Sequence, residues 1–248
     1  GIEELLNELN ENNIKNVIII GSPFIYLTKL IENKINNNYP QGTIFFPAHT
    51  VPKTDKPIKA PKRLKNILSD IDVETEKKIN HELLIDYIEK ISPKPFTVCL
   101  SYTDYVKENI EIYQNRGWKV ISLGSRNNPE MLFNFYREVI KYENVISSEL
   151  GSAVFYALYL KKKVKVMFEI NGNNINGNKN NSYIKMIFYK NFPKLFDDFL
   201  SGEDGYKLAC EELGSQNIFN KYDLINILGW DNWYKNFFAR IYSLRNYL

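Results

Sequence analysis

Small and hydroxyl-bearing residues gather in one loop of the sequence, where a predicted strand gives way to a predicted helix. The loop Ser147-Ser148-Glu149-Leu150-Gly151-Ser152 follows the apolar pair Val145-Ile146. The first turn of a helix leaves several backbone N–H groups without partners, and the peptide dipoles place partial positive charge there. Small residues let a phosphate approach closely, and serine hydroxyls can donate to its oxygens. The segment Asn144–Val166 is therefore predicted to build an anion-binding loop at a helix N-terminus.

Structural roles for the same residues are the alternative. Ser148 or Ser152 can simply cap the helix while Gly151 eases packing. Glu149 is favourable near a helix start, yet its carboxylate would repel a phosphate in the same position. We therefore expect Glu149 either to accept hydrogen bonds from ribose hydroxyls or to be a solvated surface residue.

Three further places could contact a ligand. The turn Gly21-Ser22-Pro23 offers backbone groups, but a single glycine favours a plain strand-to-helix turn and the full GxGxxG pattern is absent. His49 ends an apolar strand, where its imidazole could act as a base, donate to phosphate or be structural. Ser125 and Arg126 follow another strand, and Arg126 could hold a phosphate bidentately or be an exposed arginine.

Two polar residues are predicted to have no ligand role. Asp104 follows a strand and precedes a helical stretch, which is typical of a helix N-cap, with a catalytic carboxylate as the alternative. His81 lies between charged residues within a predicted helix, so we expect a solvated side chain.

The pattern of apolar residues predicts an α/β fold with a parallel sheet. Ligands of such sheets bind beyond the carboxyl ends of the strands, in the loops named above. From residue 96 onward, strands alternate with helices of about 10 to 13 residues, which indicates right-handed crossovers. The predicted strands there are Phe96–Leu100, Lys119–Leu123, Val145–Ile146 and Val164–Phe168, and the predicted helices are Asp104–Arg116, Pro129–Tyr142 and Ser152–Leu160.

The first part of the chain is predicted to form a separate domain. Asn16–Ile20 and Gly42–Phe46 are apolar enough for buried strands, and Phe24–Asn36 and Val73–Ile91 have helical spacing. The proline-rich Ser92-Pro93-Lys94-Pro95 is typical of a linker. We therefore expect an N-terminal domain over residues 1–93 and a second domain over 94–248.

Composition narrows the class of protein. A net charge of +3 over 248 residues lacks the basic footprint of a nucleic-acid binder. Two distant cysteines, Cys99 and Cys210, suit a reducing compartment, and two histidines cannot furnish a His-rich metal site. No stretch approaches the roughly 18 to 20 apolar residues of a membrane span, and no signal peptide is visible. We expect a cytoplasmic protein.

The run Tyr142–Val166 resembles the C-terminal nucleotide-sugar half of GT-B glycosyltransferases, in particular the bacterial sialyltransferase and capsule or lipooligosaccharide transferase groups. In those proteins a strand ends in a Ser-Ser or Ser-Thr pair, which Ser147 and Ser148 match. Asn16–Leu27 and Ile44–Thr50 also resemble proteins encoded in surface-polysaccharide loci. The family's His-Pro pair is replaced here by Leu123-Gly124-Ser125-Arg126.

The resemblance implies two Rossmann-like halves, an acceptor-side half over 1–93 and a nucleotide-sugar half over 94–248, with C-terminal helices packing back across the cleft. It also implies an enzyme that transfers a sugar from a nucleotide donor, such as CMP-sialic acid, to a glycan acceptor. The Ser147–Ser152 loop would stabilise the leaving phosphate with help from Arg126, and His49 is the best available base. No metal or other cofactor is expected, because folds of this kind often hold the leaving group with protein dipoles alone.

Other functions remain open. A sugar-nucleotide epimerase or hydrolase would use the same plan, and a non-catalytic nucleotide-binding or scaffold protein would keep the loop without the base. Peripheral membrane association is a further alternative. The aromatic C-terminal helix around Trp233 could close over the N-terminal half or pair with a second copy in a homodimer.

Overall fold

A computed structural model describes residues 11, 17–31, 39–48, 80–125, 127–167 and 192–230 of the chain. The chain divides into two compact units. One unit is Leu27–Glu212, and the other combines Gly1–Tyr26 with Leu213–Leu248.

The larger unit is built on a sheet of five parallel strands in the order β3-β2-β1-β4-β5. This is the strand order of Rossmann-like doubly wound sheets. The strands of this sheet are apolar because they are buried between two layers of helices, and in β2 all five residues are buried. The strands are β1 (Thr43–Phe46), β2 (Phe96–Leu100), β3 (Lys119–Ser122), β4 (Asn144–Ser147) and β5 (Lys163–Val166). The predicted α/β class with a parallel sheet is thus confirmed.

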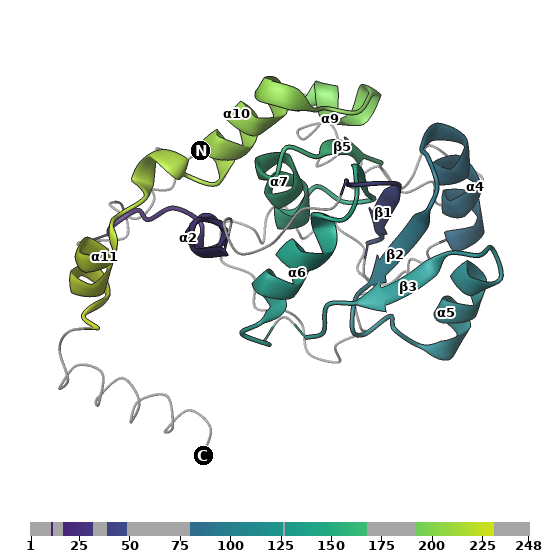
Figure 1. The fold of residues 1–248 in the computed structure, drawn as a ribbon, viewed down its shortest axis with the longest axis horizontal. Coiled ribbons are helices and arrows are strands. Elements are labelled where there is room, and N and C mark those ends of the chain that lie inside the picture. Colours follow the sequence, from purple (N-terminus) through teal and green to yellow (C-terminus); the bar gives the residue numbers. More distant parts are fainter. Residues whose placement is uncertain are drawn as a thin grey trace, which may run out of the picture. The chain divides into compact units, whose positions relative to one another are not determined.

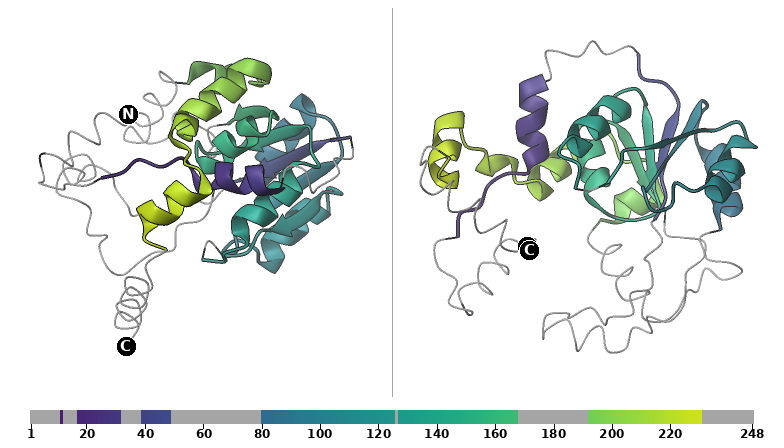
Figure 2. Two further views of the ribbon diagram at one scale, coloured as in Figure 1. Left: turned by 60° about the vertical axis from the view of Figure 1, so that its left-hand side comes forward. Right: turned by 90° about the horizontal axis from the view of Figure 1, so that it is seen from below.

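Helices cover both faces of this sheet. Figures 1 and 2 show α4 (His81–Ile91) and α5 (Lys107–Gln114) on one side, and α6 (Met131–Val139) and α7 (Ser152–Tyr159) on the other. The α4–α5 side holds a continuous apolar core in which α4 contributes Leu84, Ile85 and Ile88. The predicted helices of this region exist, with ends that differ by up to three residues from the expected ones at α5, α6 and α7.

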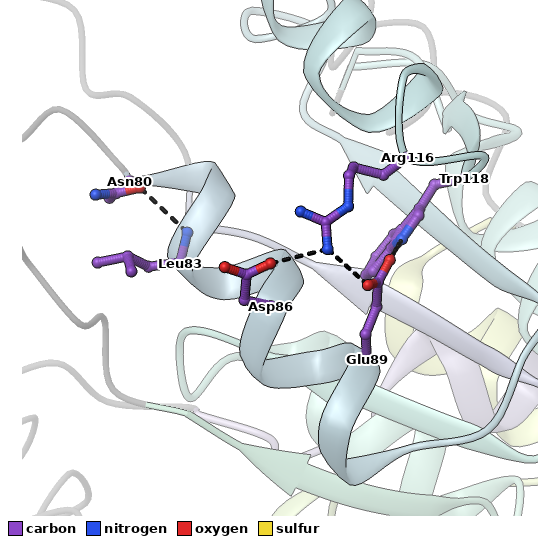
Figure 3. A network of polar contacts seen from close by, with 6 residues as sticks. All are labelled: Asn80, Leu83, Asp86, Glu89, Arg116 and Trp118. Atoms are coloured by element: carbon purple, nitrogen blue, oxygen red, sulfur yellow. Dashed lines mark hydrogen bonds and ion pairs between the residues drawn. The ribbon is translucent and has the colours of Figure 1, made fainter.

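A polar network ties α4 to the end of α5 (Figure 3). The Arg116 guanidinium lies 2.8 Å from an Asp86 oxygen and 2.7 Å from Glu89 Oε2. Glu89 Oε1 also accepts a hydrogen bond from Trp118 Nε1 at 2.9 Å. The buried Trp118 ring stacks on Phe96 of β2 with 4.8 Å between centroids, so the network is anchored in the core.

Two C-terminal helices belong to the same unit: α9 (Pro193–Asp197) and α10 (Gly202–Glu212). Leu200 exchanges backbone hydrogen bonds with Val164 of β5, and α10 packs along α7. A Cβ at Gly205 would lie 2.9 Å from the Leu158 side chain, so glycine permits this close approach.

The sheet crosses the domain boundary that the sequence suggested at residue 93. β1 lies in the middle of the sheet and pairs with both β2 and β4. The Ser92–Pro95 segment packs beside β1, since Thr43 Oγ1 donates to the Pro93 carbonyl and Thr43 N–H to the Pro95 carbonyl. It is a tight connection from α4 to β2 and not an interdomain linker.

The strand predicted at the start of the smaller unit is not formed. Residues 17–20 of the expected strand Asn16–Ile20 form no strand, and Ile18 is 54% exposed. A buried strand needs neighbours on both sides, and this segment has no place in the five-stranded sheet. It leads into α2 (Pro23–Ile31), whose residues up to Tyr26 belong to this unit. Among the described residues of the unit, the other elements are η1 (Ser215–Asn217) and α11 (Lys221–Leu228).

Candidate ligand-binding site

The strand order reverses at β1. From β1 the chain proceeds to β2 and β3 on one side of the sheet, then returns to β4 and β5 on the other. The next described helix after β1 is α4 on one face of the sheet, and the helix after β4 is α7 on the other face. In open α/β sheets, ligands bind beyond the carboxyl ends of such strands. The residues after Phe46 and Ser147 therefore occupy the position where a ligand is expected.

Ser148 joins the ends of these two strands. Its Oγ accepts a hydrogen bond from the Ala48 N–H at 2.5 Å, and its own N–H donates to the Phe46 carbonyl at 3.1 Å. Both Ser148 and Ala48 are buried. Because the hydroxyl acts here as the acceptor, its hydrogen is left to donate to another group.

Ser147 plays a different part. Its Oγ donates to the Glu149 carbonyl at 2.7 Å and accepts from the Glu149 N–H at 3.3 Å. Its carbonyl accepts the Met167 N–H at 2.7 Å. The hydroxyl of Ser147 thus holds the loop backbone, whereas the hydroxyl hydrogen of Ser148 remains available to donate to a ligand. The loop pattern alone predicts the same role for both serines, namely donation to a phosphate.

The first turn of α7 is open to solvent. Its N-cap is Gly151, and no side chain caps it, so the alternative that Ser148 or Ser152 caps this helix is wrong. A Cβ at Gly151 would meet nothing within 4 Å, so packing does not require glycine there either. The amides of Ser152 and Ala153 make no backbone hydrogen bond in the described part of the chain. The Ser152 and Ala153 amides therefore present free donors at a helix N-terminus, beside the exposed Gly151.

Glu149 lies exposed in this loop. Its backbone carbonyl and amide are held by Ser147, as described above, which fixes the loop backbone independently of the carboxylate. The carboxylate therefore stands at the solvent side of the site, where either of its expected roles is compatible with the backbone.

Ser125 lies at the same edge of the sheet but farther away. It follows β3, the outermost strand, and two strands separate β3 from β4. Ser125 Oγ accepts from the Asn127 N–H at 3.3 Å, and its carbonyl accepts from the Asn128 N–H at 2.9 Å. Three strand spacings amount to about 14 Å. Arg126 and His49 lie outside the described residues, and their roles stay predictions.

Gly21 and Ser22 belong to the smaller unit. The Gly21 N–H donates to the Asn217 carbonyl at 2.9 Å and the Ser22 N–H to the Leu213 carbonyl at 2.8 Å. A Cβ at Gly21 would lie 2.2 Å from the Ile218 side chain. Packing against the C-terminal segment thus explains this glycine, and both amides already have acceptors in the chain.

A partly buried polar cluster lies between α4 and α5, and the sequence pattern does not predict it. His81 Nδ1 lies 2.7 Å from the hydroxyl of Tyr113, which is fully buried. Burial lowers the pKa of His81, an effect that the nearby Asp104 carboxylate opposes, and burial raises the pKa of Tyr113. His81 was expected to be solvated and Asp104 to cap α5, whereas the N-cap of α5 is Val106 and Asp104 is buried. Nothing in the spacing of His81 and Tyr113, 32 residues apart, signals their contact.

Within the described ranges, no three His, Cys, Asp or Glu side chains come together in a way that could hold a metal ion. In the same part of the chain, no helix has both the length and the apolar character that crossing a membrane requires. Comparisons of the chain with protein-family models, with curated proteins and with solved structures found no match.

Proposed function

We propose that this chain is a GT-B-like glycosyltransferase that uses a nucleotide-activated sugar, of the CMP-sialic acid type, in bacterial surface glycan synthesis. One observation carries the proposal: the uncapped N-terminus of α7 lies beside the donor-bearing Ser148 where the strand order reverses. Such a place suits the phosphate of a nucleotide. The resemblance of Tyr142–Val166 to the nucleotide-sugar half of GT-B enzymes supports it.

The reaction would be displacement at the anomeric carbon of the donor sugar. The bond between that carbon and the phosphate oxygen breaks while an acceptor hydroxyl oxygen forms the new bond and loses its proton. The Ser152 and Ala153 amides and the Ser148 hydroxyl would stabilise the negative charge that develops on the leaving phosphate. His49 is the proposed base for the acceptor proton.

In this proposal the five-stranded sheet, β1 included, corresponds to the nucleotide-sugar half. The acceptor side would then involve residues outside this sheet. The hydroxyl of Ser147 would act indirectly, by holding the Glu149 backbone and so the loop that precedes α7.

The test compares two substitutions at Gly151, Gly151→Asp and Gly151→Asn, which have nearly the same shape and differ in charge. Both side chains are good N-caps, and Gly151 has the extended backbone and the open space that a cap needs. Isothermal titration with CMP, UDP and GDP should show nucleotide binding by the wild type and weaker binding by Gly151→Asn, whose side chain competes with the phosphate for the Ala153 N–H. Gly151→Asp should bind at least 10-fold more weakly than Gly151→Asn, because its carboxylate also repels the phosphate.

Equal nucleotide affinities of the Asp and Asn variants would contradict the phosphate site. Replacing Ser147 and Ser148 together with Ala should also weaken nucleotide binding. Release of free sugar from CMP-sialic acid would then distinguish an enzyme from a non-catalytic nucleotide-binding protein, and transfer to a glycan acceptor would distinguish a transferase from a hydrolase.

A further inference from the structure

Two tyrosine rings stand exposed on the loop that joins β2 to α5. Tyr102 is 53% exposed and Tyr105 is 44% exposed. Neither ring makes a hydrogen bond or a ring contact with the described part of the chain. Tyr113 and Trp118 of the same unit are, by contrast, buried in its core. The two exposed rings therefore contribute little to folding.

The backbone that carries these rings is held in place. Asp104 lies between them in sequence and is buried, and its N–H donates to the Ser101 carbonyl at 3.0 Å. Its own carbonyl accepts from the Asn109 side chain at 3.0 Å. The hydroxyls of Ser101 and Thr103 are hydrogen-bonded to each other at 2.8 Å. A ligand that stacks on the rings would thus meet a loop that is already ordered.

The loop lies at the ligand-binding edge of the sheet. β2 is the neighbour of β1, and β4 lies on the other side of β1. The carboxyl ends of β2 and β4 are therefore two strand spacings apart, about 10 Å. A nucleotide has a comparable length from its phosphate to its base, so one molecule can reach from the start of α7 to the loop after β2.

We infer that Tyr102 and Tyr105 form a stacking platform for the base of the nucleotide whose phosphate is bound at the N-terminus of α7. This inference rests on the proposed function and adds the direction in which the nucleotide lies, from β4 across β1 toward β2. Every base has a flat π-face, so tyrosine rings can stack on it without reading its hydrogen-bonding edge.

The test measures the affinity of the full chain for CMP, UDP and GDP and for ribose 5-phosphate, which has the phosphate but no base. Replacing Tyr102 and Tyr105 together with Ala should weaken nucleotide binding about 5- to 150-fold, the range expected for lost stacking on a base. The affinity for ribose 5-phosphate should not change. The double Phe variant, which keeps both rings, should bind nucleotides like the wild type.

Tyr222→Ala provides the matched control, because Tyr222 is an exposed tyrosine on α11. It should leave all affinities unchanged. Unchanged nucleotide affinity in the double Ala variant overturns the stacking platform but leaves the phosphate site to the Gly151 variants. Equal losses for CMP and ribose 5-phosphate overturn it as well. Should the double Ala variant fail to fold, saturation transfer in the wild type from tyrosine protons to the base protons of CMP decides, and its absence overturns the inference.

Discussion

The Ser148 hydroxyl oxygen accepts the Ala48 N–H at 2.5 Å and so joins the ends of two adjacent strands that lie 100 residues apart in the chain. The bond lies beyond the carboxyl ends of β1 and β4, where the strand order reverses. A residue proposed to contact the ligand is therefore also part of the fold. Experiments on this site must separate effects on stability from effects on binding.

Ser148→Ala should lower the free energy of unfolding by about 1 to 3 kcal/mol, because the buried Ala48 N–H loses its acceptor. Urea denaturation measures this loss. Ser152→Ala is the control: Ser152 is exposed and caps nothing, so its change should stay within about 0.5 kcal/mol. Similar stabilities of the two variants would show that the Ala48–Ser148 bond contributes little.

Replacing glycine with alanine should destabilise the protein much more at Gly21 than at Gly151. At Gly21 the new Cβ would lie 2.2 Å from the Ile218 side chain and 2.9 Å from the Gly214 carbonyl oxygen, so Gly21→Ala should cost about 1 to 3 kcal/mol. Gly151→Ala meets open space and loses only the preference of an N-cap for glycine, so it should cost less than about 1 kcal/mol. Hydrogen exchange of the Gly21 and Ser22 amides, both bonded to the C-terminal segment, reports the first effect locally. Unaltered exchange in Gly21→Ala would contradict the packing described for this turn.

Stability should fall when the pH drops below the usual histidine pKa of 6.5. Burial lowers the pKa of His81 in the folded chain. Between that lowered value and 6.5, the unfolded chain binds the proton more readily, so acid favours unfolding and the stability at neutral pH is lost as pH falls. Protonation makes both imidazole nitrogens donors, so the Tyr113 hydroxyl can then only accept from Nδ1.

Urea unfolding between pH 7.5 and 5 measures this dependence, and His81→Gln should flatten it. The control His49→Gln should leave it in place. NMR titration of the imidazole gives the pKa of His81 directly, and Asp104→Asn should lower that pKa further, since the Asp104 charge raises it. A His81 pKa at or above 6.5 in the wild type would contradict the burial effect.

Glu89→Ala should destabilise the protein more than Asp86→Ala does. Both carboxylates pair with Arg116 at nearly the same distance, but Glu89 also accepts the Trp118 N–H (Figure 3). Losing that acceptor leaves the N–H of a buried side chain unpaired, so we expect a difference of about 1 to 3 kcal/mol by urea denaturation. An exposed pair such as Asp86–Arg116 contributes at most about 1 kcal/mol.

In a Trp118→Phe background the difference between the two variants should shrink, because the N–H is gone in both. It should also shrink as the pH falls. The Trp118 hydrogen bond, with Arg116 second, holds the pKa of Glu89 below its usual value of 4.5, so the stabilisation is lost as the pH falls through the lowered folded-state value. A difference that persists in the Phe background would assign the effect to something other than this hydrogen bond.

Local sequence patterns were sufficient for most of the sheet unit. The apolar run Phe96–Leu100 predicted β2 to the residue, and the small residues before Ser152 marked the start of α7. The strand β2 could be predicted because it is buried on both faces, and the start of α7 because it depends on residues close together in the sequence. The apolar run before Gly21 predicted a strand that is absent over residues 17–20. β-branched residues favour a strand only where neighbouring strands exist, and the run itself carries no information on its neighbours.

The sequence by itself determined the α/β class, the alternation of strands and helices, and the loop at which a helix N-terminus opens after β4. Periodicity and turn chemistry act over a few residues, so they can be read along the chain. Only the tertiary structure decided that β1 joins the later strands, that Ser148 bonds Ala48 while Ser147 serves its own loop, and that His81 meets Tyr113. These depend on which distant segments lie side by side, and that is set by packing the whole core at once.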